Sequence, residues 1–364
     1  ARERVEKLMP TKLLLRKAED TAIHNPLATA GMEQHEHRAH WRALRREAVL
    51  EPDLPIIDPH HHLWARPGNR YLVDDYLSDT LSGHNIKASV FVECGAFYRK
   101  GGPVIMAPVG EVEFANGVAA MAASGTYGST MICSGIVGSA VAQVLDAQIA
   151  AGGGRFRGIR VITKWDSDEG LNTGRYIMPR TLMQDPDFRA GFATLAPRRL
   201  SFDAMIYHPQ LPELAELARA FPDTTIILNH IGGLLAWTRN YLPRKAEAIA
   251  QWRTAMAELA QCPNVYVKLG GLGMAYLGLG FDKLEAPATS AQLAESWGPL
   301  FVHCIDQFGP DRCMFESNFP PDRESVDFPI IWNAFKRIAA DYSADEKRAL
   351  FHDTAVQAYR LNVD

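Results

Sequence analysis

Short apolar segments alternate with longer amphipathic segments from Leu54 onwards. The apolar segments are 4–9 residues long, rich in Val and Ile, and apolar on both faces, which is typical of parallel strands buried on both sides. Eight of them follow one another: LPIID (54–58), ASVFVEC (88–94), STMICSGIV (129–137), RGIRVIT (157–163), SFDAMIY (201–207), TTIILNH (224–230), NVYVKLG (264–270) and RCMFES (312–317). Helical patterns such as 212–223 and 246–263 lie between several of them, so the sequence predicts a (β/α)8 TIM barrel.

An open, doubly wound sheet is the alternative fold. It would be expected to carry a G-x-G-x-x-G turn after its first strand, and the sequence has none there. The first fifty residues differ from the rest, because 2–20 and 32–50 are rich in charge and have a helical pattern. We therefore predict a helical N-terminal extension (residues 1–53) packed on a TIM-barrel domain (residues 54–364).

Composition and charge narrow the class of protein. The chain has 364 residues, of which 47% are hydrophobic and 22% charged, and its net charge of −4 offers no basic stripe for nucleic acid. We find no apolar run near the roughly 18 residues that a membrane helix needs, and no secretory signal. We expect a small-molecule substrate, no nucleic-acid or membrane partner, and a homo-oligomer formed, if at all, through the charged N-terminal helices.

The cysteines indicate a reducing compartment. There are five, an odd number, widely scattered and without a CxxC pair, which favours free thiols and a cytoplasmic location. Cys94, at the end of strand two, is the only thiol placed to act as a nucleophile, although a buried small apolar side chain is the commoner explanation. The G-x-S-x-G and H-E-x-x-H motifs are absent from the sequence.

The strongest chemical signal is Asp58-Pro59-His60-His61-His62, directly after the first apolar run. Alternate side chains of a strand share a face, so His60 and His62 would point together into the barrel mouth. Two neighbouring imidazoles can bind one divalent metal, with zinc the expected ion, or polarise a substrate carbonyl without any metal. A solvated histidine turn is the structural alternative. His208 and His230 end strands five and six, so three strands would deliver histidines to one rim.

Other strand ends carry charged or polar side chains. Glu93 ends strand two, Arg160 lies in strand four and Lys268 in strand seven. The two cations are candidates for holding a substrate carboxylate, although each could equally be a strand-end charge that reaches water or a neighbour. Three more polar residues could reach the mouth from beyond strand eight: Ser317, Asn318 and Asp322.

A rival histidine cluster, His35-x-His37-x-x-His40, lies in the extension. On a helix His37 and His40 share a face. No third ligand shares that face, so we interpret this cluster as a solvated helical surface rather than a metal site.

Ile57-Asp58-Pro59-His60-His61-His62-Leu63-Trp64 resembles the strand-one signature of the amidohydrolase superfamily. Further segments resemble its amidohydrolase-related branch, which includes 2-pyrone-4,6-dicarboxylate lactonase, sugar lactonases and sulfomuconolactone hydrolase; these segments are 156–160, 207–233, 264–273 and 308–323. The resemblance runs from about residue 54 to residue 360 and does not cover the extension.

The resemblance implies a distorted TIM barrel that hydrolyses lactones or related esters of small acids. It places His60, His62 and His230 in the site, with His208 at the strand-five position. Some relatives hold a divalent metal, whereas the pyrone lactonase is understood to work without one.

One position departs from the relatives, which typically end strand eight with an S-D-W-P-like sequence whose Asp activates the attacking water. Here the aligned residues are Ser317-Asn318-Phe319-Pro320. An amide has no useful basicity, so Asn318 can orient water but cannot take its proton. Asp322 is the nearest carboxylate that could substitute, and Glu93 or a neutral histidine are alternatives.

We therefore hypothesise a hydrolase that opens a small carboxylated lactone, or cleaves a related ester, by carbonyl polarisation at the histidines and attack of water. The alternatives are a non-oxidative decarboxylase of the same superfamily and a catalytically impaired barrel that only binds a small acid. The expected catalytic residues are His60, His62, His230, Asn318 and Asp322. The expected substrate contacts are Glu93, Arg160, His208, Lys268 and Ser317.

Overall fold

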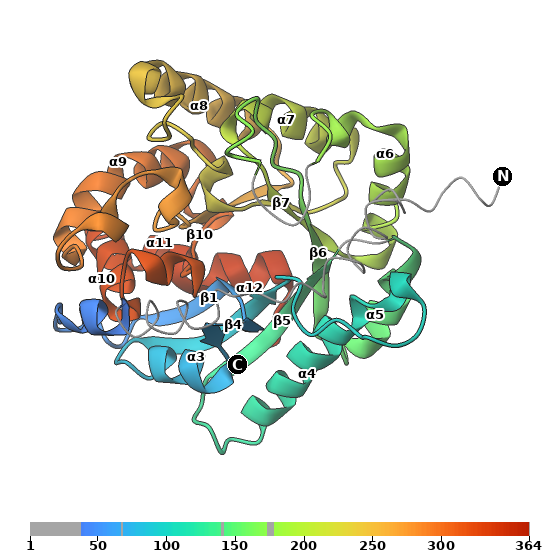
Figure 1. The fold of residues 1–364 in the computed structure, drawn as a ribbon, viewed down its shortest axis with the longest axis horizontal. Coiled ribbons are helices and arrows are strands. Elements are labelled where there is room, and N and C mark those ends of the chain that lie inside the picture. Colours follow the sequence, from blue (N-terminus) through green and yellow to red (C-terminus); the bar gives the residue numbers. More distant parts are fainter. Residues whose placement is uncertain (1–37, 67, 140–141, 173–177, 364) are drawn as a thin grey trace.

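The chain is an eight-stranded parallel barrel. The computed structural model describes residues 38–66, 68–139, 142–172 and 178–363. Its eight parallel strands form one sheet in the order β1-β4-β5-β6-β7-β8-β9-β10, surrounded by helices (Figure 1). The strand order follows the chain without the reversal that defines a doubly wound sheet, so the predicted (β/α)8 barrel is confirmed.

All eight predicted strands are present. The barrel strands are β1 (Pro55–His61), β4 (Asn85–Val92), β5 (Met131–Ser139), β6 (Phe156–Ile162), β7 (Ser201–Met205), β8 (Ile226–Leu228), β9 (Val265–Leu269) and β10 (Cys313–Phe315). A separate antiparallel pair consists of β2 (Trp64–Arg66) and β3 (Asn69–Tyr71). The predicted strands ran two residues too far at the ends of β7, β8 and β10. After β8 and β10 the two extra residues are polar, and they include His230 and Glu316.

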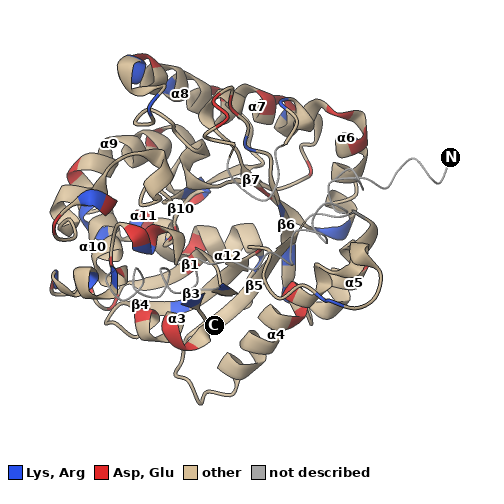
Figure 2. Cartoon of the chain, viewed as in Figure 1, with Lys and Arg blue, Asp and Glu red and all other residues tan. Residues whose placement is uncertain are grey.

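The helices between the strands cover the outside of the barrel. They are α3 (Val73–Thr80), α4 (Val109–Ala123), α5 (Leu145–Ala151), α6 (Pro186–Phe192), α7 (Leu211–Ala220), α8 (Lys245–Leu259) and α9 (Ser290–Phe308). Three more helices follow the last strand: α10 (Phe328–Ile338), α11 (Ala344–Arg348) and α12 (Thr354–Tyr359). The predicted helices at 212–223 and 246–263 correspond to α7 and α8. In the view of Figure 2, charged residues of both signs are spread over these outer helices.

The last helix, α12, lies inside the ring of outer helices (Figure 1). Apolar residues of five strands form a buried cluster with Ala355, Ala358 and Tyr359, separate from the larger core under the outer helices; these strand residues are Ile57, Val90, Val137, Ile227 and Met314. One end of the barrel is therefore filled by side chains, and the carboxyl ends of the strands are left for chemistry.

The barrel closes through the loop that follows β10. His61 forms an isolated parallel bridge with Phe319. The amide of His62 donates to the carbonyl of Phe319 at 2.8 Å, and the amide of Asn318 donates to the carbonyl of His60 at 3.0 Å. The seam between the first and last strands is thus made by backbone hydrogen bonds of the two segments that carry most of the predicted site residues.

A buried carboxylate reinforces this seam. Asp58 accepts the amide of Ser317 at 3.0 Å, the hydroxyl of Ser317 at 2.6 Å and the hydroxyl of Tyr76 at 2.8 Å. Burial raises the pKa of Asp58 to about 6, although these hydrogen bonds oppose the shift. Asp58 therefore joins β1, the segment after β10 and α3 at one point.

The described part of the extension is only partly helical. Residues 38–43 form a helix and residues 44–50 do not, so the helix predicted over 32–50 is wrong for its last part. Tertiary hydrogen bonds hold that part along α10, since the Leu50 amide donates to Asn333 Oδ1 and Lys336 donates to the Leu50 carbonyl. The helix predicted at 2–20 and most of the predicted extension 1–53 lie outside the described residues.

One helical stretch of the described residues, Val104–Ala123, has the length and composition of a membrane span, with a mean hydropathy of 1.2. This corrects the expectation that no apolar run reaches that length. Within the barrel, the α4 part of this stretch buries Val112, Ala115 and Val118 in the main core, so its apolar character has an explanation in packing.

Candidate functional site

His60 and His62 point together from the end of β1, as their spacing predicts. Their Nε2 atoms are 3.2 Å apart, and Nδ1 of His62 lies 2.7 Å from the carbonyl of Val92. Because a carbonyl only accepts, Nδ1 of His62 donates and its Nε2 is left with a lone pair. His61 faces the other way and stacks on Tyr76, with ring centroids 4.1 Å apart.

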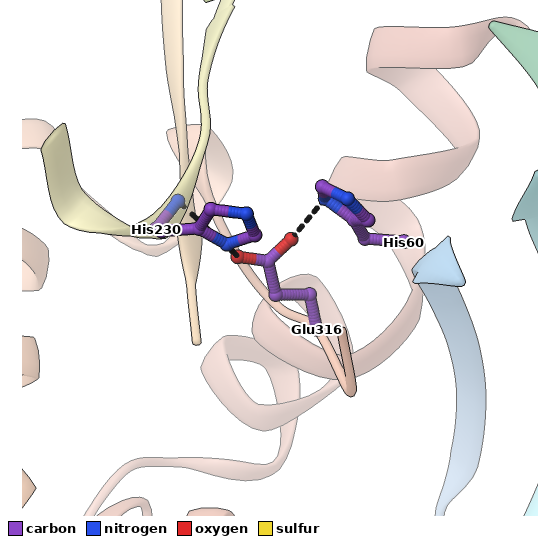
Figure 3. A group of neighbouring side chains, drawn as sticks. All are labelled: His60, His230 and Glu316. Carbon is purple, nitrogen blue, oxygen red and sulfur yellow. Dashed lines mark hydrogen bonds and ion pairs between the residues drawn. The ribbon is translucent and has the colours of Figure 1, made fainter. Parts of the chain in front are cut away.

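Glu316, directly after β10, lies between His60 and His230 (Figure 3). Its Oε1 accepts from Nδ1 of His230 at 2.6 Å and from the His230 amide at 3.2 Å. Its Oε2 is 2.6 Å from Nδ1 of His60, yet this contact lacks hydrogen-bond geometry and leaves Oε2 without a hydrogen-bond partner among the described residues. We call His60, His62, His230 and Glu316 the histidine–glutamate cluster. Sequence reasoning did not single out Glu316, although a charged residue ending an apolar strand was a signal.

Three members of this cluster could hold a metal. The ligand atoms of His60, His230 and Glu316 all lie within 4.8 Å of one another, the only such group in the described ranges. Two imidazoles and a carboxylate are a donor set found in catalytic zinc sites. Glu316 forms no ion pair with a Lys or Arg among the described residues. Its negative charge is therefore free to balance part of the positive charge of a divalent cation. The residues fit such a metal.

Arg160 of β6 is held against the cluster by Glu93. Its Nε donates to Glu93 Oε1 at 2.9 Å, its NH2 donates to the Glu93 carbonyl, and its NH1 lies 3.2 Å from Nε2 of His60. A metal between His60 and His62 would therefore lie beside a guanidinium cation. That two-histidine metal site stays a prediction, and the set that includes Glu316 has the better electrostatics.

Lys268 of β9 also has a carboxylate of its own. Its Nζ donates to Asp203 Oδ1 at 2.8 Å and lies 3.3 Å from Nδ1 of His60. The same Asp203 oxygen accepts from the hydroxyl of Tyr359 at 2.7 Å and from Asn229 Nδ2 at 3.0 Å. Both Lys268 and Asp203 are fully buried, so this pair is part of the barrel interior as well as of the site wall.

Burial keeps the strand-one histidines neutral. Burial lowers the pKa of both His60 and His62 well below the usual value. The positive charge of Lys268 lowers the pKa of His60 further, and that of Arg160 lowers the pKa of His62 further. Neutral imidazole is the form that binds a metal or accepts a proton, so these residues are ready for either role at neutral pH.

Asn318 and Asp322 are bonded to each other. Asn318 Nδ2 donates to Asp322 Oδ1 at 2.7 Å, and the other Asp322 oxygen accepts the Gly273 amide at 3.1 Å. Burial raises the pKa of Asp322 well above its usual value. Both carboxylate oxygens of Asp322 accept hydrogen bonds, and one of these bonds fixes the Asn318 side chain. The role of Asp322 as the base stays a prediction.

Ser317 reaches the histidine–glutamate cluster only at its backbone, because its hydroxyl lies 3.5 Å from the His60 carbonyl. His208 makes no hydrogen bond to the cluster among the described residues. The Ser317 hydroxyl donates to Asp58 at the seam. His208 lies in the short helix η7 (His208–Gln210), where its Nδ1 accepts the Leu235 amide at 3.4 Å and burial lowers its pKa to about 4. Their substrate contacts stay predictions.

Two rival candidates of the described residues, His40 and Cys94, contribute no chemistry to this site. His35 and His37 lie outside the described residues, and His40 is exposed. Cys94 donates to the carbonyl of Leu63 at 3.4 Å, and burial raises the pKa of its thiol well above the usual value. A thiol without thiolate character is a poor nucleophile.

Curated relatives resemble the chain over different shares of its length. An uncharacterised protein of Sinorhizobium fredii is 34% identical over 337 residues, which are 85% of this chain and 99% of that protein. An L-fucono-1,5-lactonase of Burkholderia multivorans is 29% identical over 188 residues, which are 50% of this chain and 58% of the lactonase. The match to the lactonase thus spans little more than half of that enzyme.

Solved structures share the fold, and a family model covers the barrel. A crystal structure of an amidohydrolase from Burkholderia multivorans with bound Hepes has a TM-score of 0.64 at 25% identity, over 84% of this chain and 99% of that one. Its zinc-bound counterpart has the same TM-score at 24% identity and the same coverage. The model of the amidohydrolase family matches residues 57–361, which confirms the predicted family and makes the protein a hydrolase. The chain belongs to the amidohydrolase family.

Proposed function

We propose that this chain opens a small carboxylated lactone, or cleaves a related ester, by attack of water on the carbonyl. Family membership supports hydrolysis, and the similarity to L-fucono-1,5-lactonase supports a ring ester as substrate. The observation that carries the proposal is Glu316, buried between His60 and His230 at the carboxyl ends of the strands. A carboxylate paired with imidazoles is a common arrangement for activating water.

The pairing of Glu316 with His230 prepares a base. Because Oε1 of Glu316 accepts from Nδ1 of His230, the imidazole carries its proton on Nδ1 and a lone pair on Nε2. None of the described residues hydrogen-bonds that Nε2. His230 can therefore take a proton from the attacking water, and the carboxylate stabilises the imidazolium that forms.

Arg160 is placed to stabilise the developing oxyanion. Glu93 engages its Nε and NH2, while NH1 faces the ring of His60 and retains hydrogens for a ligand. A divalent ion held by His60, His230 and Glu316 would supply Lewis-acid polarisation of the same carbonyl, and His230 would then act as a ligand instead of as the base. Asn318, held through its amide nitrogen, keeps its carbonyl oxygen to orient water.

The proton count closes without any other reactant. The water oxygen bonds to the carbonyl carbon as its proton passes to His230. The bond between that carbon and the ring oxygen then breaks, and the proton passes from His230 to the ring oxygen. The product is a hydroxy acid.

A panel of lactones tests this function. Wild-type protein is incubated with L-fucono-1,5-lactone, 2-pyrone-4,6-dicarboxylate and paraconate, and acid release is followed with a pH indicator. We expect at least one lactone to open, and Glu316→Gln to lower kcat at least about 100-fold. Glu258→Gln, at a half-exposed surface pair, is the matched control. A wild type that opens none of them, or a Glu316→Gln variant with full turnover, contradicts the proposal.

Two further measurements separate the alternatives. Release of CO2 without uptake of labelled oxygen from water would favour a decarboxylase. Elemental analysis of protein purified without chelator tests the metal, because Glu316→Gln should lose bound zinc whereas Glu258→Gln should keep it.

The cellular setting belongs to this proposal. All five cysteines are free, which supports a reducing compartment such as the cytoplasm. A homo-oligomer through the N-terminal helices, and a small molecule as the partner in place of nucleic acid or membrane, stay proposals.

A further inference from the structure

The two cations deepest in the site are already engaged, because each has a buried carboxylate partner and the proposed function assigns the free NH1 of Arg160 to the oxyanion. Arg160 is paired with Glu93 at 2.9 Å and Lys268 with Asp203 at 2.8 Å. All four side chains are buried, and breaking either pair would leave a buried charge uncompensated. A carboxylate on the substrate therefore needs a different cation.

Lys164, two residues beyond the end of β6, is such a cation. It is half-buried, and no carboxylate of the described residues forms an ion pair with it. Its Nζ lies 4.7 Å from the ring centroid of Tyr276 and 5.4 Å from that of Tyr207. Aromatic faces attract a cation but leave its N–H donors without acceptors.

Lys164 belongs electrostatically to the site. Burial, and then the positive charge of Arg160, lower the pKa of Lys164 to about 8. The ammonium is thus still mostly protonated at pH 7, and a negative ligand would relieve both the desolvation and the repulsion from Arg160.

Tyr276, in the short helix η10 (Ala275–Leu277), adds an uncommitted donor. The hydroxyl of Tyr207 donates to the carbonyl of Leu171 at 2.7 Å, whereas that of Tyr276 bonds to no described residue. Burial, the neighbouring Tyr207 and Asp322 raise the pKa of Tyr276 well above its usual value, and Arg160 opposes the shift. Tyr276 is therefore a neutral phenol close to the catalytic residues.

We propose that Lys164 and Tyr276 form an anion subsite at the barrel mouth, which binds the carboxylate of the substrate and selects carboxylated lactones over neutral ones. This inference rests on the proposed lactonase function for its kinetic consequence. An ammonium and a phenol hydroxyl are both donors, and a carboxylate offers two acceptor oxygens to them. The reacting carbonyl would lie deeper, at the histidine–glutamate cluster.

Kinetics of matched substrates test the subsite. Each carboxylated lactone of the panel is compared with its neutral carboxamide. We expect Lys164→Met to raise KM for the carboxylates at least about tenfold, as loss of one charge-assisted contact implies, and to leave KM for the carboxamides within about threefold. Tyr276→Phe should act in the same direction with a smaller effect. Equal losses on both kinds of substrate, or no loss on either, overturn the proposal.

A binding experiment keeps this proposal separate from the lactonase activity. Glutarate, a small dicarboxylate without an ester, is titrated into wild type, Lys164→Met and the control Lys87→Met, which alters an exposed lysine near the start of β4. If no lactone is opened, the proposed function fails, but glutarate still decides the subsite. Weaker binding by Lys164→Met than by Lys87→Met supports it, and equal binding, or no binding by wild type, overturns it.

Discussion

Removal of one member of the buried Lys268–Asp203 pair should strongly destabilise the fold, because the charge of the other member is left uncompensated. Both side chains are fully buried, 2.8 Å apart. Asp203→Asn keeps the shape and an acceptor for Tyr359 and Asn229, but it removes the negative charge. Leaving one member of a buried pair uncompensated costs about 3–5 kcal/mol.

The size of the thermal shift follows from the length of the chain. With an unfolding entropy of about 2.1 cal/mol/K per residue, a chain of 364 residues loses about 1.3 °C of Tm for each kcal/mol. Asp203→Asn should therefore lower Tm by about 4–7 °C. Calorimetry and urea denaturation of the same samples measure both quantities.

Two comparisons make this reasoning refutable. Glu258→Gln breaks a 2.9 Å pair with Arg219 on the surface, where the two side chains are 48% and 49% exposed. It should cost no more than about 1 kcal/mol. Adding Lys268→Met to Asp203→Asn removes the uncompensated charge and should restore at least about 2 kcal/mol. An Asp203→Asn variant as stable as Glu258→Gln, or a double variant no better than Asp203→Asn, would refute the argument.

Three further predictions follow from single contacts. His84 accepts a hydrogen bond from Lys336 at 2.9 Å, and burial lowers its pKa to about 4. As the pH falls from about 6.5 towards 4, this histidine is protonated in the unfolded chain but not in the folded one, so the free energy of unfolding decreases. Urea denaturation at pH 7.5 and pH 4.5 should show that this decrease is about 2 kcal/mol smaller in His84→Gln than in wild type. A Cβ at Gly271, whose φ is +74°, would lie 2.4 Å from the ring of His230. Gly271→Ala should therefore lower kcat on the best lactone at least about 100-fold, while the far-ultraviolet circular dichroism spectrum stays unchanged. Unchanged turnover would contradict the catalytic role of the His230 imidazole. Ser317→Ala removes a hydroxyl donor from the seam carboxylate and should cost about 1–3 kcal/mol in urea denaturation, whereas a loss below 0.5 kcal/mol would argue against a closing role.

The barrel could be predicted from the sequence because parallel strands that are buried on both faces consist almost entirely of apolar residues. Each strand appears as an apolar run, and alternation alone brings His60 and His62 to one face. The extension was less predictable. Its charges and leucines favour a helix, yet residues 44–50 instead follow the hydrogen bonds offered by Asn333 and Lys336, which are far away in sequence.

The pairing of charges could not be predicted in the same way. The sequence shows Arg160 and Lys268 as strand cations, but not that Glu93 and Asp203 already neutralise them. Asp203 is one charge inside an apolar run, and its partner is 65 residues away. Glu316 lies 86 residues from His230, so neither local pattern nor spacing links the two. Contacts of this kind depend on barrel closure, which only the folded chain supplies.

The loop behind β10 both carries Asn318 and completes the ring through Phe319. Because the backbone hydrogen bonds of this segment close the barrel, it cannot move away to admit a ligand without breaking them. An insertion in it would open the barrel and expose unpaired strand edges. Evolution of new substrate preferences in this scaffold should therefore spare that loop and work through the connections after β4, β6 and β9. Insertion libraries would be expected to tolerate additions in those three connections and to lose folded protein when residues are added between β10 and Phe319.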